Sequence, residues 1–262
     1  MRLLPPCSRV RPLSPMPSLP ALPDGWRLEH ISEIDGTNAE LLRRAEAGEA
    51  AGLALHADVQ SAGRGRRGRS WNSPKGNLYL STLVDAKQVT AGQVGFAAAL
   101  ALIEAIEADV GKDIPELRCK WPNDLLFNGA KVAGLLLEAV PNRDQVVVGM
   151  GVNLIPINVA DAVYPVGALT DYGIDPKSLA ARVCDALGRW LETWNTVGFA
   201  PLRRAWLERA TGLGETIIVR LPNDQLDGTF EGLAEDGALL LNQGAAGIRT
   251  VSAGDVFFGV EA

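Results

Sequence analysis

Short segments with strand-like patterning recur between residues 25 and 211 of the chain. Residues 53–60 (LALHADVQ) alternate between apolar and polar positions, which is typical of a strand with one buried face. Residues 77–85 (NLYLSTLVD) predict a second strand of the same kind. Residues 145–154 (QVVVGMGVNL) are β-branched and punctuated by glycine, which predicts a strand in the middle of a sheet.

A hairpin is predicted where Asn128-Gly129 separates two apolar runs within residues 119–138 (CKWPNDLLFNGAKVAGLLLE), because this dipeptide favours a two-residue turn. In that register Asp124 faces Ala133, and Lys131 projects to the same side of the sheet. A carboxylate and an ammonium group then lie on an otherwise apolar surface. This fits a cation that meets a ligand carboxylate or phosphate, and it fits equally a lysine that reaches solvent beside Asp124.

Helical signals separate these strands. Thr37 is the predicted N-cap of one helix, and Glu40 stands three residues later as in a capping box. Asp175 is the predicted N-cap of another, with Pro176 at its first position. Residues 90–111 are rich in alanine and mostly apolar, which predicts a buried helix. Helices are therefore expected over residues 37–48, 90–111, 175–198 and 200–210.

The two ends of the chain differ from its middle. Residues 1–24 are rich in proline, which predicts an extended, poorly ordered lead-in, and translation from Met16 instead of Met1 would shorten it. Residues 212–262 consist of short strands separated by turn residues, the pattern of a small β-barrel. We therefore expect a lead-in over 1–24, a main domain over 25–211 and a small β domain over 212–262. We expect no stretch to be long and apolar enough to span a bilayer, and hence no membrane partner.

Composition narrows the function classes. The net charge is -6, which argues against a general nucleic-acid-binding protein. The three cysteines, Cys7, Cys119 and Cys184, are widely spaced, and the chain has two histidines. Neither a disulfide framework nor a zinc site is therefore expected. Thiols without partners fit a reducing cytoplasm.

Residues 61–81 (SAGRGRRGRSWNSPKGNLYLS) contain the pattern G-x-G-x-x-G, but the helix that a dinucleotide-binding turn needs does not follow it. Loop residues and a strand follow instead, and the chain has no P-loop lysine motif. What remains is a glycine-rich loop with four arginines, followed by Trp71. Such a loop suits an anionic nucleotide that orders it on binding, with an aromatic face for a base; a solvated basic loop is the alternative.

Four motifs in order carry a resemblance to a known family. The segment GRGRRGRSW, followed by KWPNDLLFNGAKVAGLLLE, with DGTN upstream and GMGVN downstream, resembles the biotin protein ligases, or biotin–[acetyl-CoA-carboxylase] ligases. The match covers about residues 30–260. It implies an α+β fold, a mixed β-sheet flanked by helices as in class II synthetases, followed by a small SH3-like β-barrel. Because the chain has no room for an N-terminal winged helix, it resembles the monofunctional members, and no DNA partner is expected.

The resemblance also implies a reaction. Biotin and ATP give biotinyl-5′-AMP, with Mg²⁺ as a further cofactor. A lysine of a biotin carboxyl carrier domain of a biotin-dependent carboxylase then takes the biotinyl group. Family members are often dimers, so a homodimer is compatible with it.

The site residues follow from the same resemblance, position by position. Catalytic roles fall on Lys131, Arg64 and Arg66. Contacts to biotin fall on Gly36, Thr37, Asn38, Gln60, Arg64, Gly65, Arg66, Lys131 and Gly134. Contacts to ATP or the adenylate fall on Arg66, Arg67, Arg69, Trp71, Asn123, Asp124, Lys131 and Asn153, with Asp124 as the candidate ligand of Mg²⁺. One departure is Gly36, where the family often has serine, so a side-chain hydroxyl contact to biotin is missing there.

Two other interpretations stay open from the sequence. A lipoate–protein ligase shares the fold and the acyl-adenylate chemistry, although the arginine loop with its tryptophan and the KWPND run favour biotin. A nucleic-acid-binding module would use the loop arginines and the β-barrel, but the net acidity argues against it.

Overall fold

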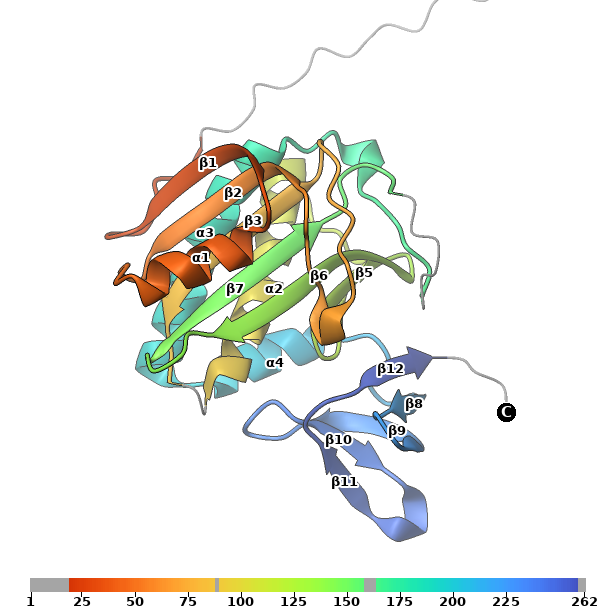
Figure 1. Cartoon of the computed structure of the whole chain (residues 1–262). Coiled ribbons are helices and arrows are strands. Elements are labelled where there is room, and N and C mark those ends of the chain that lie inside the picture. Colours follow the sequence, from red (N-terminus) through yellow and green to blue (C-terminus); the bar gives the residue numbers. More distant parts are fainter. Residues whose placement is uncertain (1–18, 88–89, 158–163, 259–262) are drawn as a thin grey trace, which may run out of the picture.

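A computed structural model describes residues 19–87, 90–157 and 164–258, and residues 1–18 of the expected lead-in lie outside this part. The chain forms a seven-stranded mixed sheet with helices on both faces, followed by a small five-stranded antiparallel sheet (Figure 1). This architecture confirms the fold class expected from the sequence.

The large sheet has the strand order β1-β2-β3-β7-β6-β5-β4, so β7 is its central strand, as its composition predicts. Only β1 and β2 pair in parallel, and all other neighbours are antiparallel. The strands are β1 (Arg27–Ile34), β2 (Leu53–Gln60), β3 (Leu78–Asp85), β4 (Leu117–Lys120), β5 (Asp124–Phe127), β6 (Ala130–Ala139) and β7 (Gln145–Val152).

Helices cover the two faces of this sheet unequally. α1 (Thr37–Glu46) lies alone on one face against β3 and β7, whereas α2 (Ala91–Val110), α3 (Pro176–Val197) and α4 (Ala200–Glu208) cover the other (Figure 1). Asp175 caps α3 as predicted, because its carboxylate accepts a 2.8 Å hydrogen bond from the Ser178 amide. The predicted cap of α1 is wrong by one residue. Gly36 is the N-cap, and Thr37 is the first helical residue.

By length and composition alone, one helix could span a bilayer, so the expectation that no segment could do so is wrong. α2 contains an 18-residue window with a mean hydropathy of 1.4. In the structure this helix packs between the sheet and α3, and 61% of that window is buried. An internal helix of a domain is apolar on most sides for the same reason as a membrane helix, because protein surrounds it.

The predicted hairpin forms with a correction to its register. Asn128 (φ 49°) and Gly129 (φ 78°) both adopt positive φ, as a type I′ turn requires. Beyond the turn, a bulge between Leu125 and Leu126 shifts the register, so Asp124 pairs with Gly134 and not with Ala133. Asp124 therefore lies opposite a residue one position farther along β6 than the predicted register gives.

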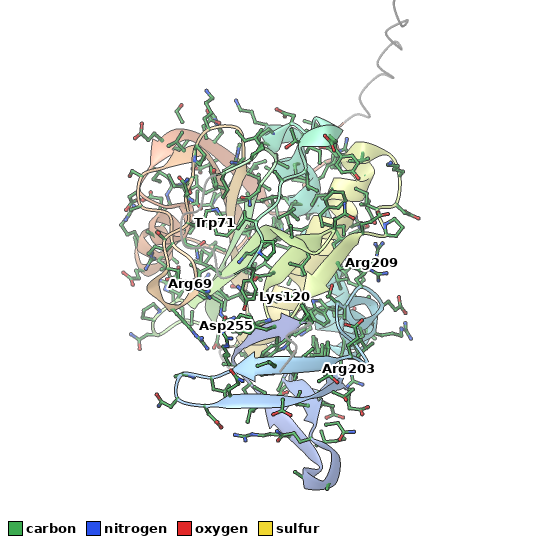
Figure 2. The ribbon with its side chains drawn as sticks, turned by 90° about the vertical axis from the view of Figure 1, so that its right-hand side faces the viewer. Arg69, Trp71, Lys120, Arg203, Arg209 and Asp255 are labelled. Atoms are coloured by element: carbon green, nitrogen blue, oxygen red, sulfur yellow. The ribbon has the colours of Figure 1, made fainter. Side chains whose placement is uncertain are left out.

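The second sheet has the order β11-β10-β9-β8-β12. Its strands are β8 (Thr216–Arg220), β9 (Gln225–Leu233), β10 (Leu239–Asn242), β11 (Ile248–Val251) and β12 (Asp255–Phe258). This small sheet packs on the large domain. Trp121 donates a 3.1 Å hydrogen bond to the Gly237 carbonyl, and Arg203 of α4 donates one of 3.1 Å to the Leu233 carbonyl. Figure 2 shows Arg203 beside the small sheet. β12 thereby lies next to the open edge of the site described below.

His56 on β2 predicts a stability loss in acid. Its side chain is buried, its Nε2 atom has no hydrogen-bond partner among the described residues, and burial lowers its pKa to about 4. The nearby charged or titratable groups are His30, Asp58, Lys177 and Asp175. Above pH 6.5 the ring is neutral in both states. As the pH falls toward 4, only the unfolded chain binds a proton there, so the free energy of unfolding decreases by up to about 3 kcal/mol.

We expect His56→Leu to remove most of this loss in urea unfolding curves measured at pH 7.5 and pH 4.5. His30→Gln measures the smaller second contribution, because the His30 ring lies 5.4 Å from that of His56 and its charge also lowers the pKa of His56. An equal acid loss in wild type and His56→Leu would contradict the assignment.

Candidate functional site

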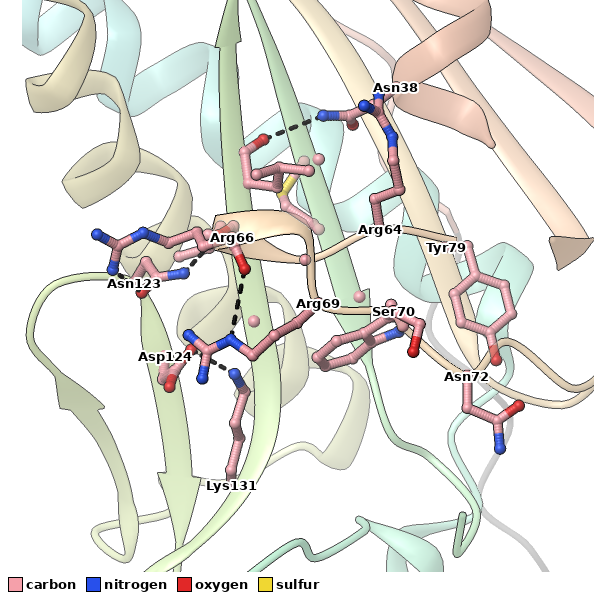
Figure 3. A pocket seen from close by; sticks show the side chains of 18 of the residues that line it. Asn38, Arg64, Arg66, Arg69, Ser70, Asn72, Tyr79, Asn123, Asp124 and Lys131 are labelled. Carbon is pink, nitrogen blue, oxygen red and sulfur yellow. Dashed lines mark hydrogen bonds and ion pairs between the residues drawn. The ribbon is translucent and has the colours of Figure 1, made fainter. Parts of the chain in front are cut away.

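A cavity of about 530 Å³ opens on the face of the large sheet that carries α1 (Figure 3). Its walls come from segments far apart in sequence: the start of α1, the end of β2, the glycine-arginine loop, the β5–β6 hairpin, β7 and β12. Of the residues expected at the site, the cavity is lined by Gly36, Thr37, Asn38, Gln60, Arg64, Gly65, Arg66, Arg69, Trp71, Asn123, Asp124, Lys131, Gly134 and Asn153. Arg67 is the exception and does not line it.

Glycines form the floor of the cavity. Gly134 of β6 and Gly151 of β7 are cross-strand neighbours, and the Trp71 ring lies directly over them. A Cβ atom on Gly151 would come within 2.6 Å of the indole, and one on Gly149 would overlap the Asn38 amide. The glycines thus let flat polar and aromatic groups approach the sheet, a role that only a residue without a side chain can fill.

A buried polar network closes one end of the cavity. The Thr37 amide and hydroxyl both donate to Gln60 Oε1, at 2.9 and 3.1 Å. The Ser81 hydroxyl lies 2.7 Å from the Thr37 hydroxyl and 2.6 Å from Asn38 Oδ1. Asn38 Nδ2 donates to Glu138 at 2.8 Å. These hydrogen bonds fix the orientation of the side-chain amide and hydroxyl groups, which suits them to bind a polar ligand.

Gly36 lines the same end, but its amide already donates to the Asp35 carboxylate at 2.8 Å. Arg43 holds that carboxylate and lowers the pKa of Asp35 to about 2. The backbone N–H of Gly36 therefore already has a hydrogen-bond partner within its own turn. Gly36 contributes to the cavity wall by its position and not by a hydrogen bond.

The glycine-arginine loop arches over the cavity. Arg64 pairs with Glu138 at 3.2 Å. Arg66 donates to Asn123 Oδ1 at 2.9 Å (Figure 3). Burial lowers the pKa of Arg66, yet its guanidinium stays charged because its ordinary value is so high. Arg66 is thus a partly desolvated cation that faces the cavity with a neutral partner.

The other two loop arginines reach the small β domain. Arg67 Nη1 lies 2.7 Å from Asp255 Oδ2, and Arg69 Nη2 lies 3.4 Å from Asp255 Oδ1. Figure 2 places Arg69, Lys120 and Asp255 where the two sheets meet. Arg67 does not line the cavity itself, and its ion pair with Asp255 joins the loop to β12.

Lys131 and Asp124 form the ion pair that the hairpin pattern left open. Lys131 Nζ lies 2.6 Å from Asp124 Oδ1 and 5.4 Å from the Trp71 ring centroid. Both side chains are largely buried at the cavity wall. Beside them, Asn153 donates to the Gly167 carbonyl at 3.1 Å, while its buried Oδ1 has no partner among the described residues. The pair thus lies in the wall of the cavity and is not a contact on the open surface.

Sequence reasoning missed several residues at the cavity. Lys120 and Tyr164 line it, as does Asp255, and Glu138 and Ser81 hold its polar groups. Lys120 belongs to the KWPND run, so the sequence did offer a signal for it. Asp255 lies in a tail without any comparable pattern, and only the packing of β12 brings it here.

The donor atoms suit Mg²⁺ to a limited extent. Among the described residues no three His, Cys, Asp or Glu side chains gather as a metal cluster. Mg²⁺ characteristically takes one or two protein carboxylates together with substrate phosphates and water. Asp124, with Asn123 beside it at the cavity, provides one such carboxylate, which fits a metal held mainly by a nucleotide.

Comparison with known families gives two matches. The biotin/lipoate A/B protein ligase family matches residues 35–153, and the biotin protein ligase C terminal domain matches residues 212–259. The first range contains the cavity residues from α1 to β7, and the second contains β12.

Individual proteins agree with these matches. A biotin–[acetyl-CoA-carboxylase] ligase of Paracoccus denitrificans is 43% identical over 87% of this chain and 99% of its own length. The bifunctional ligase/repressor BirA of Escherichia coli is 34% identical over 84% of this chain and 70% of its own. Among solved structures, the biotin protein ligase of Aquifex aeolicus in complex with biotin and ATP is 28% identical, with a TM-score of 0.74 over 88% of this chain and 97% of that one.

Proposed function

The chain belongs to the biotin protein ligase family, and from that premise we propose that it activates biotin with ATP as biotinyl-5′-AMP and passes the biotinyl group to a lysine of a biotin carboxyl carrier domain. The observation that carries the proposal is one cavity that joins a neutral hydrogen-bonding end to a cationic end across a glycine floor. An uncharged polar ring and an anionic phosphate need these two environments in one ligand site.

The neutral end suits biotin. Thr37, Asn38 and Gln60 offer donors and acceptors whose orientation is fixed by their own network. The sulfur-containing ring is mostly apolar and fits the aliphatic side chains of β6 and β7 that line the cavity beside the Trp71 ring, which covers Gly134 and Gly151. Its carboxylate tail then extends toward Lys131, which lies on β6 beyond Gly134.

The cationic end suits the first reaction step. A carboxylate oxygen of biotin attacks the α-phosphorus of ATP, and the bond to the bridging oxygen of the leaving pyrophosphate breaks. Two anions must approach each other, so cations lower the barrier. Lys131, which pairs with Asp124, and Arg66, which donates to Asn123, both bring positive charge to the cavity, and Trp71 offers a face for the adenine. When bound with the nucleotide, Mg²⁺ supplies further charge neutralisation, with Asp124 as its protein ligand.

The second step joins the acyl group to the carrier. The lysine amine of the carrier domain attacks the mixed anhydride, and AMP leaves. Because water would hydrolyse the anhydride, the loop from Arg64 to Arg69 acts as a cover over it. A cytoplasmic location agrees with a reaction that consumes ATP and with buried, unpaired thiols at Cys119 and Cys184.

A lipoate ligase remains the second candidate, since the matching family includes lipoate enzymes. The full-length likeness to a biotin–[acetyl-CoA-carboxylase] ligase and the match of residues 212–259 favour biotin. Calorimetric titration with each acid in the presence of a non-hydrolysable ATP analogue separates them. We expect heat from biotin and none from lipoate, and binding of lipoate alone would refute the proposal.

Arg66→Ala is expected to loosen the cover over the intermediate. The variant loses a charge-assisted contact to the adenylate and the bond to Asn123, so biotinyl-AMP should escape roughly 10-fold faster or more. Release is measured by rapid filtration of enzyme loaded with labelled biotin. Arg27→Ala, which removes an exposed arginine paired with Glu49, is the matched control. Unchanged release in Arg66→Ala would argue against the loop as a cover.

A further inference from the structure

Gly36 is a buried glycine of the cavity wall that the fold does not require. It stands at the N-cap of α1 with a φ of -172° and a ψ of 135°, which is extended backbone that any residue adopts. A Cβ atom there would lie 3.7 Å from the Ala62 carbonyl oxygen, 3.8 Å from Ala39 Cβ and 4.0 Å from Gln60 Oε1. These are ordinary van der Waals distances, so neither the backbone nor the packing excludes a side chain at this position.

Two glycines in the floor of the cavity differ from Gly36 in this respect. A Cβ atom on Gly149 would come within 2.1 Å of Asn38 Oδ1, and one on Gly151 within 2.6 Å of the Trp71 ring. At those two positions other protein atoms already take the place of a side chain. Outside the turn of Gly36, by contrast, no atom of the described residues comes closer than 3.7 Å to the place of its Cβ atom.

The position of Gly36 at the start of α1 favours a different residue. A serine, threonine, asparagine or aspartate at an N-cap accepts a hydrogen bond from an amide of the first turn, and α1 has no such side-chain cap. The hydrogen bonds that Gly36 does make, to Asp35 and from Glu40, use backbone atoms that any residue supplies. The helix thus gains nothing from glycine here, and the space that a side chain would take belongs to the cavity.

The neighbours of Gly36 are held in place and do not fill this space. Gln60 is fixed at both atoms of its amide group. Its Oε1 atom accepts from the amide and the hydroxyl of Thr37, at 2.9 and 3.1 Å, and its Nε2 atom donates to the Ser73 hydroxyl at 3.0 Å. The two alanines have no side-chain atom beyond Cβ. Because the wall around Gly36 cannot collapse, the space remains open to a ligand.

Building on the proposed function, we propose that Gly36 widens the substrate range of this chain to cyclic-urea acids that carry one small substituent, such as a methyl group, on a ureido nitrogen. The ureido group is the polar part that suits Thr37 and Gln60, so a substituent on it reaches the space beside Gly36. The methyl group replaces one N–H donor of the ligand. Gln60 Oε1 already accepts two hydrogen bonds from Thr37, so it is not left unpaired. The reaction is otherwise that of biotin: the carboxylate oxygen attacks the α-phosphorus of ATP, and pyrophosphate leaves.

Substitutions that fill the space test the proposal. Pyrophosphate release is measured with biotin, with 1′-N-methylbiotin and with 3′-N-methylbiotin, which carry the methyl group on one or the other ureido nitrogen. We expect wild type to use one of the two analogues with a kcat/KM within about 10-fold of that for biotin. Gly36→Ala and Gly36→Ser should each lower the ratio of analogue to biotin by roughly 10–100-fold, because a group that no longer fits a packed pocket has an effect of this size. The ratio is taken within one enzyme preparation, so a general loss of activity does not change it.

Gly92→Ser is the matched control, because a Cβ atom on Gly92 meets nothing within 4 Å and the residue lies on α2, away from the cavity. Its ratio should equal that of wild type. A wild-type chain that adenylates biotin but neither analogue would overturn the inference and leave the proposed function standing, and so would an unchanged ratio in both Gly36 variants. Should these variants fail to fold, calorimetry on wild type decides, since binding of neither analogue within about 10-fold of biotin would likewise overturn the inference. A folded wild-type chain that does not adenylate biotin would refute the proposed function itself.

Discussion

Lys131→Ala is expected to lower the rate of biotin-dependent adenylation by about 10²–10³-fold, because the variant lacks the cation that meets the biotin carboxylate and the α-phosphate. Lys131 is the ammonium group on the β6 wall of the cavity, and its Nζ atom lies 2.6 Å from Asp124. Its backbone still pairs with Pro165 and Gly167, so the loop that follows β7 keeps its anchor in the variant. Single-turnover formation of biotinyl-AMP is the appropriate measurement.

Lys75→Ala provides the control for Lys131→Ala. Lys75 is 78% exposed and pairs loosely with Asp58 at 3.7 Å, so its loss should leave adenylation unchanged. A melting temperature recorded for both variants separates a lost charge from a lost fold, since Lys131→Ala leaves Asp124 without its partner. Adenylation near the wild-type rate in folded Lys131→Ala would refute the role.

Gly149→Ala is expected to lower kcat/KM for biotin by about 100-fold with little change in the affinity for ATP. The new methyl group would occupy the place of the Asn38 amide, which must then leave the sheet. Asn38 would lose its contacts to Ser81 and to Glu138 together. The effect should therefore fall on the neutral end of the cavity, as steady-state kinetics with each substrate varied in turn can establish.

Gly92→Ala is the matched control for Gly149→Ala. A Cβ atom on Gly92 meets nothing within 4 Å, and the residue lies in the first turn of α2. Alanine there should preserve activity and stabilise the helix slightly. Equal kinetic effects of the two substitutions, or no effect of Gly149→Ala, would contradict the role of the glycine floor.

Local chemistry made much of the fold predictable. Asn128-Gly129 and the cap at Asp175 are signals that act over a few residues, and both appear in the structure. The central position of β7 followed from its apolar, β-branched run. The apolar α2 could be predicted as a helix, but its suitability for a bilayer was misjudged. Hydropathy does not distinguish a helix that protein surrounds from one that lipid surrounds.

Features that depend on distant packing could not be predicted from the sequence. The bulge next to Leu125 changed the partner of Asp124, because strand pairing and not the turn decides it. Asp255 joins the loop arginines only because β12 packs against the large domain. Most cavity positions came instead from the resemblance to a family, and Arg67, assigned to the nucleotide on that basis, does not itself line the cavity but pairs with Asp255, which does.

Transfer of labelled biotin to a purified biotin carboxyl carrier domain tests the central claim most directly. We predict covalent labelling of one lysine that requires ATP, releases pyrophosphate and AMP, and disappears in Lys131→Ala. Labelling that proceeds without ATP, or no labelling by a folded wild-type chain that binds biotin, would contradict the proposed function.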